Sequence, residues 1–262
     1  MERIFIIKIG GNVLDDARLL EKFLADFSAV KGNKVLIHGG GKIATRIGEQ
    51  LGIRSQYVNG RRITDEQTRD LVTMVYGGLV NKQIVSALQA LGCNAIGLTG
   101  ADGQSVTAVR RPVKEIDYGF VGDITPESVN ARFLQELIAA GTVPVFAPLT
   151  YADGMILNTN ADTIASVLAV ALSKKYEVRL IFCFEKKGVL SDVNDPASVI
   201  RRMPRGLYEQ LLEKRALVDG ILPKLENAFD AIAAGVKEVL IGEAGDLLKN
   251  TGPSTEGTLI TA

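Results

Sequence analysis

Short apolar runs alternate with longer helical patterns along most of the chain. Continuous apolar runs are typical of strands buried on both faces, and a period near 3.6 is typical of helices packed on a sheet. The expected strands cover residues 4–9, 34–37, 95–99, 143–146, 155–157, 178–184 and 239–242. The expected helices cover residues 15–30, 42–51, 65–91, 126–140, 161–172, 207–213 and a segment opening near 219. This alternation predicts an α/β fold with a mainly parallel sheet and crossover helices.

The sequence predicts further structural details for four segments. The helix at 15–30 should bury one apolar face, made of Leu19, Leu20, Phe23, Leu24 and Phe27. Residues 57–65 predict a turn that leads into the next helix, with Thr64 as its N-cap. The pair Gly77-Gly78 could kink that helix or let a neighbouring backbone approach closely. Residues 104–124 predict a hairpin outside the parallel core.

The length of 262 residues allows one large domain or two fused lobes. Neither an internal repeat nor a linker is visible, so we expect a single domain over residues 1–262. If the domain has two lobes, they share one sheet and meet near residues 173–178.

Composition narrows the classes of partner. Hydrophobic residues make up 47% of the chain and charged residues 23%, as in an ordinary soluble globular protein. The 30 basic and 30 acidic residues cancel, which argues against a nucleic-acid or membrane partner. The N-terminal apolar stretch is too short for a signal peptide, and no run approaches the roughly 18 apolar residues that span a bilayer. We therefore expect a cytoplasmic protein.

The chain has two cysteines, Cys93 and Cys183, and one histidine, His38. This set is too small for a zinc site, so no metal ligands are expected in the protein itself. Both cysteines lie in or beside apolar segments, which predicts buried, inert thiols. A single histidine also argues against a histidine-based triad. The chemistry is expected to run on lysines, glycines and backbone dipoles.

Lys8 interrupts the first apolar run, two residues before Gly10. A charged lysine does not stay in such a core unpaired. Lys8 is therefore either a cation at the strand's carboxyl end, facing an anionic ligand in a cleft, or an edge residue that reaches water. The first strand alone favours neither interpretation.

Three strand ends are rich in glycine or small polar residues, at 10–12, 39–41 and 158–162. Ligands of open α/β sheets bind at the carboxyl ends of strands, where backbone N–H groups and helix N-termini favour anions. Together with Lys8 and Lys224, these turns predict an anionic ligand with several phosphate-like charges.

Residues 39–41 have two other interpretations. They could form a tight crossing that needs no ligand, or the G-x-G-x-x-A start of a dinucleotide-binding oxidoreductase, since Ala44 has the required position. That fingerprint needs an acidic residue about twenty positions further on, at the end of a strand. Here the acids Asp65 and Glu66 fall at a helix start, which argues against the oxidoreductase. The chain has no G-x-x-x-x-G-K-[ST] sequence, so a P-loop is excluded.

Five motifs taken together resemble the amino acid kinase family, in that family's order and over essentially the whole chain. The motifs lie at residues 8–12, 38–41, 59–64, 157–162 and 220–224. Within the family they look most like the branch that acts on N-acylated glutamate. The resemblance implies a three-layer αβα sandwich of the carbamate-kinase type. It also implies transfer of a phosphoryl group from ATP to the side-chain carboxylate of N-acetyl-L-glutamate, in arginine biosynthesis. The alternatives are an N-succinyl acceptor, or a sensor of amino acids or nucleotides without turnover.

The resemblance also implies a role for individual residues. It assigns Lys8 and Lys224 to the phosphoryl group in transfer and Asp162 to the orientation of both lysines. The expected ligands of the amino acid are Gly40, Gly41, Arg62, Asn158 and Asn160. The expected ligands of ATP are Gly10, Gly11, Asn12, Glu185, Lys187 and Gly188. Arg61 is expected to be a solvated charge, and His38 to shape the glycine turn.

Three positions depart from the family pattern. The turn at 185–188 is Glu-Lys-Lys-Gly, where the family usually has an aspartate with small polar neighbours at the adenine site. Val218 replaces a common hydroxyl residue, and Ala101 stands where many relatives have lysine. Ala101 leaves the identity of the acyl group open.

The resemblance further implies that residues 1–173 bind the amino acid and residues 174–262 bind ATP. Mg²⁺ is expected to arrive on the nucleotide phosphates. Hexameric relatives carry an extra helix before the first strand, whereas this chain begins four residues before Phe5. We therefore expect a homodimer. Its expected ligands are two small molecules, ATP and the N-acylated glutamate.

Overall fold

The structure is a computed structural model that describes residues 1–192, 194–195, 197–213 and 222–262. Within these residues, the central sheet has eight strands in the order β12-β14-β13-β11-β1-β2-β8-β5. In that order they are Arg202–Pro204, Thr258–Thr261, Glu238–Glu243, Glu177–Phe184, Arg3–Ile9, Asn33–Ile37, Val143–Phe146 and Ala95–Leu98. The strands from β13 to β5 pair in parallel, and only β13 and β14 pair antiparallel. The predicted mainly parallel sheet is confirmed.

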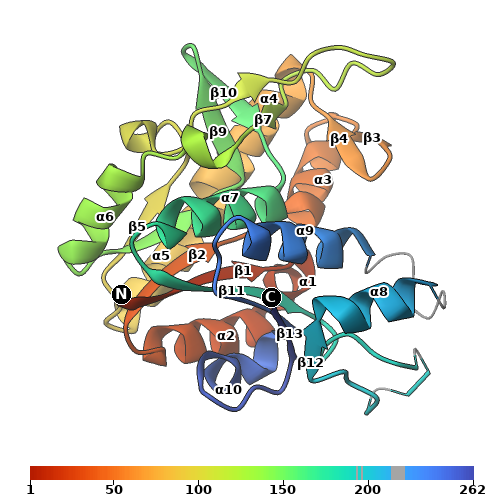
Figure 1. Ribbon diagram of the computed structural model, residues 1–262. Helices are drawn as coiled ribbons and strands as arrows, with labels where there is room; N and C mark the ends of the chain where they lie inside the picture. The colour runs from red at the N-terminus through yellow and green to blue at the C-terminus, as the bar shows by residue number, and fades with distance from the viewer. Residues whose placement is uncertain (193, 196, 214–221) are drawn as a thin grey trace.

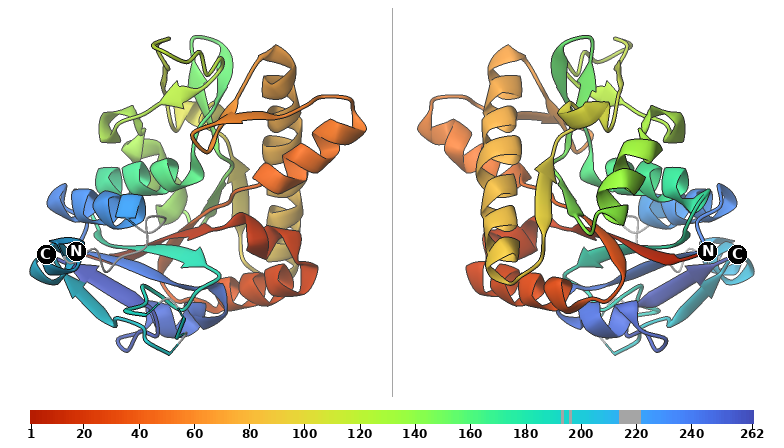
Figure 2. Two further views of the ribbon diagram at one scale, coloured as in Figure 1. Left: turned by 90° about the vertical axis from the view of Figure 1, so that its right-hand side faces the viewer. Right: turned by 90° about the vertical axis from the view of Figure 1, so that its left-hand side faces the viewer.

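Helices cover both faces of the sheet (Figures 1 and 2). One face packs against α6 (Ala131–Ala139), α7 (Ala161–Ser173), α8 (Arg205–Glu213) and α9 (Leu222–Ala233). The other packs against α1 (Gly11–Asp15), α2 (Ala17–Ala29), α3 (Gly41–Gln50), α4 (Glu66–Val72), the π-helix η1 (Thr73–Val80), α5 (Asn81–Ala90) and α10 (Leu247–Thr251). The expected three-layer αβα sandwich is therefore confirmed.

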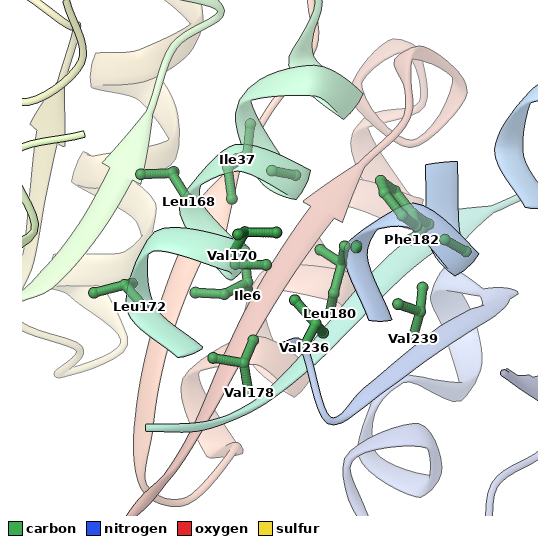
Figure 3. Packing of buried hydrophobic residues seen from close by; sticks show 14 of the residues in the cluster. Ile6, Ile37, Leu168, Val170, Leu172, Val178, Leu180, Phe182, Val236 and Val239 are labelled. Atoms are coloured by element: carbon green, nitrogen blue, oxygen red, sulfur yellow. The ribbon is translucent and has the colours of Figure 1, made fainter. Parts of the chain in front are cut away.

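Strand β1 divides its side chains between these two layers. Ile4 and Ile6 belong to the core beneath α7, whereas Phe5, Ile7 and Ile9 belong to the core beneath α2. Figure 3 shows Ile6 of β1 near Val170 of α7 in the first of these cores. Because strand side chains alternate, Lys8 points to the same side as Ile4 and Ile6. The alternation of β1 thus directs its lysine toward α7 and α9.

The expected helix at 65–91 is α4, η1 and α5 in series, and Figure 2 shows it as a rod beside the sheet. No simple kink occurs at Gly77-Gly78; an eight-residue π-helix takes its place. A Cβ on Gly77 would lie 3.3 Å from side-chain atoms of Leu149 and Thr99, so this glycine permits close packing. By length and composition Glu66–Ala90 could cross a membrane, contrary to the expectation that no segment is apolar enough to do so. Its most apolar window is 44% buried, and Leu71, Val75 and Ile84 of this helix belong to the core beneath α2.

Other local expectations need correction. Residues 56–63 form a hairpin, β3 (Gln56–Val58) and β4 (Arg61–Ile63), whose turn has positive φ at Asn59 and Gly60. Asp65, not Thr64, caps α4, because its side chain accepts from the N–H of Thr68 at 2.8 Å. Leu19 is 52% exposed and lies outside the core.

The segments outside the central sheet include further hairpins. Strands β6 (Val109–Arg110) and β7 (Gly122–Asp123) form the expected hairpin at 104–124. Strand β10 (Met155–Asn158) pairs with β9 (Leu149–Ala152), which was not predicted. Short 3₁₀ turns lie at Asp102–Gln104, Pro126–Ser128 and Ala244–Asp246, so the expected helix at 126–140 is a 3₁₀ turn followed by α6. Strands β12 and β14 and helix α10 were also not predicted.

Candidate active site

Lys8 lies in the centre of the sheet, between β11 and β2. Only 8% of the residue is exposed, so the interpretation as an edge lysine is wrong. Its Nζ lies 2.7 Å from Oδ1 of Asp162, a residue in the first turn of α7. That oxygen is buried, and apart from this ion pair it accepts no hydrogen bond within the described residues. Lys8 is therefore a buried cation in contact with a carboxylate that has room for a further donor.

Asn160 fixes the start of α7. Its side-chain oxygen accepts from the backbone N–H of Asp162 at 2.8 Å and of Thr163 at 3.0 Å. Asn160 is thus the N-cap, and Asp162 lies in the first turn, where the helix dipole favours a negative charge. The cap aims the carboxylate of Asp162 at the end of β1.

Lys224 lies in the first turn of α9 and reaches the same place. Its Nζ is 3.4 Å from the centroid of the Phe184 ring, and Nζ of Lys8 is 5.5 Å from that centroid. Burial lowers the pKa of Lys224 below its usual value, while Asp162 opposes the shift. The two lysines predicted from the sequence are brought together, around a phenylalanine that sequence reasoning missed.

The glycine turn at 39–41 rests on a buried polar network. His38 is fully buried, and its Nδ1–H donates to the carbonyl of Gly39 at 2.7 Å. Its Nε2 accepts from the amide of Asn81 at 3.1 Å, and the same amide donates to the carbonyl of Val145 at 2.9 Å. Burial lowers the pKa of His38 to about 4, so the ring is neutral at pH 7. The ring ties the turn to α5 and β8.

Gly40 must be a glycine here. Its φ is +149°, and a Cβ on it would lie 2.9 Å from the Tyr76 ring. Tyr76, from the π-helix, therefore packs directly against the turn. Sequence reasoning missed Tyr76 because its place in an apolar helix predicts a core residue.

Arg62 is buried beside Gly41. Its Nη2 donates to the carbonyl of Gly41 at 2.8 Å and to Oγ1 of Thr45 at 3.0 Å. Nη1 contacts Oγ of Ser55, and the guanidinium stacks over the Tyr57 ring with 4.8 Å to the centroid. These contacts hold a planar cation at a fixed position, which suits a carboxylate ligand.

A pocket of about 200 Å³ lies between Arg62, the glycine turn at 39–41 and the start of α7. The five residues expected to bind the amino acid all line it: Gly40, Gly41, Arg62, Asn158 and Asn160. Residues not predicted also line it, among them Tyr57, Tyr76, Arg111, Val121 and Pro148. Arg61, expected to be a solvated charge, is exposed but contributes to the lining. The pocket joins a buried arginine, a glycine turn and the start of α7.

The model of the amino acid kinase family matches residues 3–243. The chain is 54% identical over 253 residues to an acetylglutamate kinase of Parabacteroides distasonis, covering 96% of this chain and 98% of the relative. It is 50% identical over 265 residues to an acetylglutamate kinase of Cytophaga hutchinsonii, with full coverage of both. The chain belongs to the amino acid kinase family.

The fold agrees with this membership. The crystal structure of carbamate kinase from Giardia lamblia bound to AMP-PNP superposes with a TM-score of 0.71. It covers 99% of this chain and 98% of that one, at 14% identity. At this identity the likeness concerns the fold alone, and it confirms the expected carbamate-kinase-like architecture.

The glycine turn at 10–12, which was expected to bind ATP, directly follows β1 and so lies two residues beyond Lys8. Gly10 packs on the end of β11, since a Cβ there would lie 3.6 Å from the carbonyl of Cys183. Oδ1 of Asn12 accepts from Nζ of Lys42, which also lies 3.3 Å from Asp15. Lys42 was not among the expected site residues. It links the glycine turn at 10–12 to the one at 39–41.

The turn after β11 is less closely joined to the site. Glu185 and Lys187 are exposed. Glu185 raises the pKa of Lys224, but its effect is smaller than those of burial, Asp162 and Lys8. Gly188 is buried, and a Cβ on it would collide with Thr258 and Val199, so packing alone requires a glycine there. Of the motif at 220–224, Gly220 and Ile221 lie outside the described residues, as do Val218 and Asp219.

The part of the chain that the structure describes has no cluster of three His, Cys, Asp or Glu side chains that could hold a metal. Magnesium that enters on nucleotide phosphates needs no such cluster. Cys93 and Cys183 are both buried and free, as expected. Burial raises the pKa of the Cys183 thiol to about 12, which keeps it protonated.

Proposed function

We propose that this chain transfers the γ-phosphoryl group of ATP to the side-chain carboxylate of N-acetyl-L-glutamate, forming an acyl phosphate in arginine biosynthesis. One observation carries the proposal: Lys8, Lys224 and Asp162 meet at one point on the sheet, beside a pocket that contains buried Arg62. The close relatives named acetylglutamate kinase support the choice of acceptor.

The chemistry suits these residues. A carboxylate is already a nucleophile, so the reaction needs no general base. The obstacle is the approach of two anions, which positioning and charge neutralisation overcome. Lys8 and Lys224 supply positive charge to the phosphoryl group in transfer, and Asp162 holds them apart and in place. Mg²⁺ on the ATP phosphates would add further neutralisation when the nucleotide is bound.

The acceptor is held in the pocket beside these lysines. Arg62 faces the α-carboxylate, Asn158 the α-carboxylate or the acylamide, and Gly40 and Gly41 offer backbone N–H groups. Asn160 acts by capping α7 at the edge of the pocket. Ala101, which left the acyl group open, is not among the residues that line the pocket.

ATP is assigned to the C-terminal lobe, residues 174–262, with the phosphates near Gly10, Gly11 and Asn12. The support is that the residues lining the acceptor pocket all come from the first lobe, residues 1–173. Lys224 approaches from the opposite side, on α9. Glu185, Lys187 and Gly188 stay candidates for the adenine end, since they follow β11 directly.

The decisive test traps the acyl phosphate as a hydroxamate. The protein is incubated with ATP, Mg²⁺, hydroxylamine and either N-acetyl- or N-succinyl-L-glutamate. We expect a hydroxamate with the acetyl acceptor and none when EDTA removes the metal. Binding of both ligands without hydroxamate would favour a sensor, and a product from the succinyl acceptor alone would overturn the acetyl assignment.

We also infer a cytoplasmic homodimer without a nucleic-acid or membrane partner. Strand β5 forms one edge of the sheet, with Ile96 38% exposed. On the neighbouring π-helix, Met74 is 56% and Leu79 42% exposed. An unpaired edge beside apolar side chains suits a second copy of the chain. Light scattering should give a dimer mass, and Met74→Glu combined with Leu79→Glu should lower it to that of a monomer.

A further inference from the structure

Phe184 is the last residue of β11 and has no role in the reaction as described so far. It follows Cys183, which belongs to the core beneath α2, so the ring of Phe184 points to the opposite face, toward α7 and α9. There it stacks on Phe182 with ring centroids 6.2 Å apart and planes 19° apart. The outer face of the ring is left for the residues of the active site.

Two cations lie against this ring. Nζ of Lys224 is 3.4 Å from its centroid and Nζ of Lys8 is 5.5 Å from it. Among the residues that the structure describes, Asp162 is the one carboxylate that forms an ion pair with Lys8, and it also attracts Lys224. Two like charges therefore lie close together in a half-buried place, where Asp162 and, more weakly, Glu185 oppose their repulsion. The negative face of an aromatic ring adds attraction without a further anion that would repel phosphate.

We propose that Phe184 is a positioning residue for phosphoryl transfer, whose ring holds the ammonium of Lys224 beside Lys8 through a cation–π interaction. The inference rests on the proposed function, because it assigns the ring to the placement of a catalytic lysine. A ring requires no hydrogen-bond geometry, so the ammonium keeps its three donors for phosphate oxygens. A carboxylate at the same position would occupy those donors.

The test separates this role from simple packing. Phenylalanine analogues with one, two and three ring fluorines keep the shape of the side chain and progressively weaken the negative face. Placed at position 184, they should lower kcat stepwise, by about 10-fold for the trifluorinated ring. The KM for the acceptor should stay unchanged, since the pocket at Arg62 is separate. Phe182, buried on the same strand, is the matched control, and its fluorination should leave kcat unaltered.

A second measurement does not depend on turnover. The titration of Lys224 can be followed by NMR of lysine side chains, with Lys224→Arg to assign the signal. The charged groups that face Lys224 are Asp162 on α7, Lys8 on β1 and Glu185 after β11. Since the ring favours the protonated amine, fluorination at 184 should lower the pKa of Lys224, and fluorination at 182 should not.

The outcomes are distinct. If the unmodified protein makes no hydroxamate but the pKa of Lys224 falls with fluorination, the proposed function is wrong and the contact is real. If kcat and the pKa of Lys224 are both unchanged by fluorination, Phe184 only fills the core and the inference is overturned. The variant Phe184→Tyr should keep most of the activity, whereas Phe184→Leu should lose at least as much as the trifluorinated ring.

Discussion

Lys8 combines burial in the centre of the sheet with direct contact to Asp162. A lysine that acts mainly on the transition state contributes to kcat more than to acceptor binding. Replacing it should resemble the loss of an oxyanion-hole donor, roughly 3–4 kcal/mol or about a 100- to 1000-fold fall in kcat. Steady-state kinetics of Lys8→Ala should show this fall with little change in the KM for N-acetyl-L-glutamate.

The control for that variant is Lys22→Ala. Lys22 lies on α2, is 58% exposed at its side chain and pairs with Asp26 of the same helix. Its removal should leave kcat near the value of the unaltered protein. Equal losses of kcat and of acceptor affinity in Lys8→Ala would contradict a role in the transition state.

His38 gives the protein a defined pH dependence. Its pKa is about 4 in the folded state and about 6.5 when the chain is unfolded. Between these values the unfolded chain binds the extra proton, so the free energy of unfolding falls as the pH falls. The stability is complete above about pH 6.5, and about 3 kcal/mol is lost by pH 4.

Two measurements check the histidine. Since the chain has one histidine, a single imidazole signal in the NMR spectrum reports it, and this signal should titrate near pH 4. Urea unfolding between pH 4 and 7 should show the loss of stability, and His38→Gln should remove that component. A signal that titrates near pH 6.5 would mean that the ring is not buried in solution.

The residues recovered from the sequence are those whose chemistry is unusual for their surroundings. A lysine in an apolar strand is conspicuous, and Lys8 was found in this way, whereas Arg62 was assigned through the resemblance to the amino acid kinase family. Phe184 and Tyr76 look like any core residue, because an aromatic side chain in an apolar run is expected to be buried. Phe184 meets Lys224 because the end of β11 faces α9, and Tyr76 meets Gly40 because the π-helix packs on the glycine turn. Only the assembled fold shows these contacts.

Among the elements, the long apolar runs were predicted well, because burial on both faces leaves an unambiguous pattern. The short edge strand β12 and its neighbour β14 leave almost none. The π-helix at 73–80 contains Gly77, which packs closely against Leu149 and Thr99, and such a tertiary contact leaves no pattern in the sequence. The hairpin of β3 and β4 was taken for a turn because its strands have only three residues each.

The junction of α5 with β5 yields a prediction about packing. A Cβ on Gly97 would lie 2.9 Å from Cγ of Asn81 and 2.7 Å from Nζ of Lys82. Gly97→Ala should therefore push Asn81 away from His38 and destabilise the protein by roughly 1–3 kcal/mol. Urea unfolding monitored by circular dichroism would measure the change.

The matched control is Gly206→Ala on α8. A Cβ there meets nothing within 4 Å, and alanine favours a helix over glycine. This variant should be neutral or more stable by up to about 1 kcal/mol. If Gly97→Ala and Gly206→Ala had the same free energy of unfolding, Gly97 would not pack against Asn81 as described.

The two lobes expected from the sequence, residues 1–173 and 174–262, are joined by one sheet and contribute to both of its cores. Strand β1 pairs with β11 over seven positions, and the core beneath α7 joins Ile6 and Ile37 of the first lobe to Leu180 and Val239 of the second. Separating the lobes would expose this core, so neither lobe should unfold alone. The chain should therefore unfold as one cooperative unit.

Hydrogen exchange measured by mass spectrometry tests this directly. Amides of β2 in the first lobe and of β13 in the second should exchange with the same free energy of opening. N-acetyl-L-glutamate at 100 times its dissociation constant should raise both by about 2.7 kcal/mol, although its proposed pocket lies in the first lobe alone. Protection confined to β2 would show that the lobes unfold independently, and the ligand would then stabilise a domain rather than the chain.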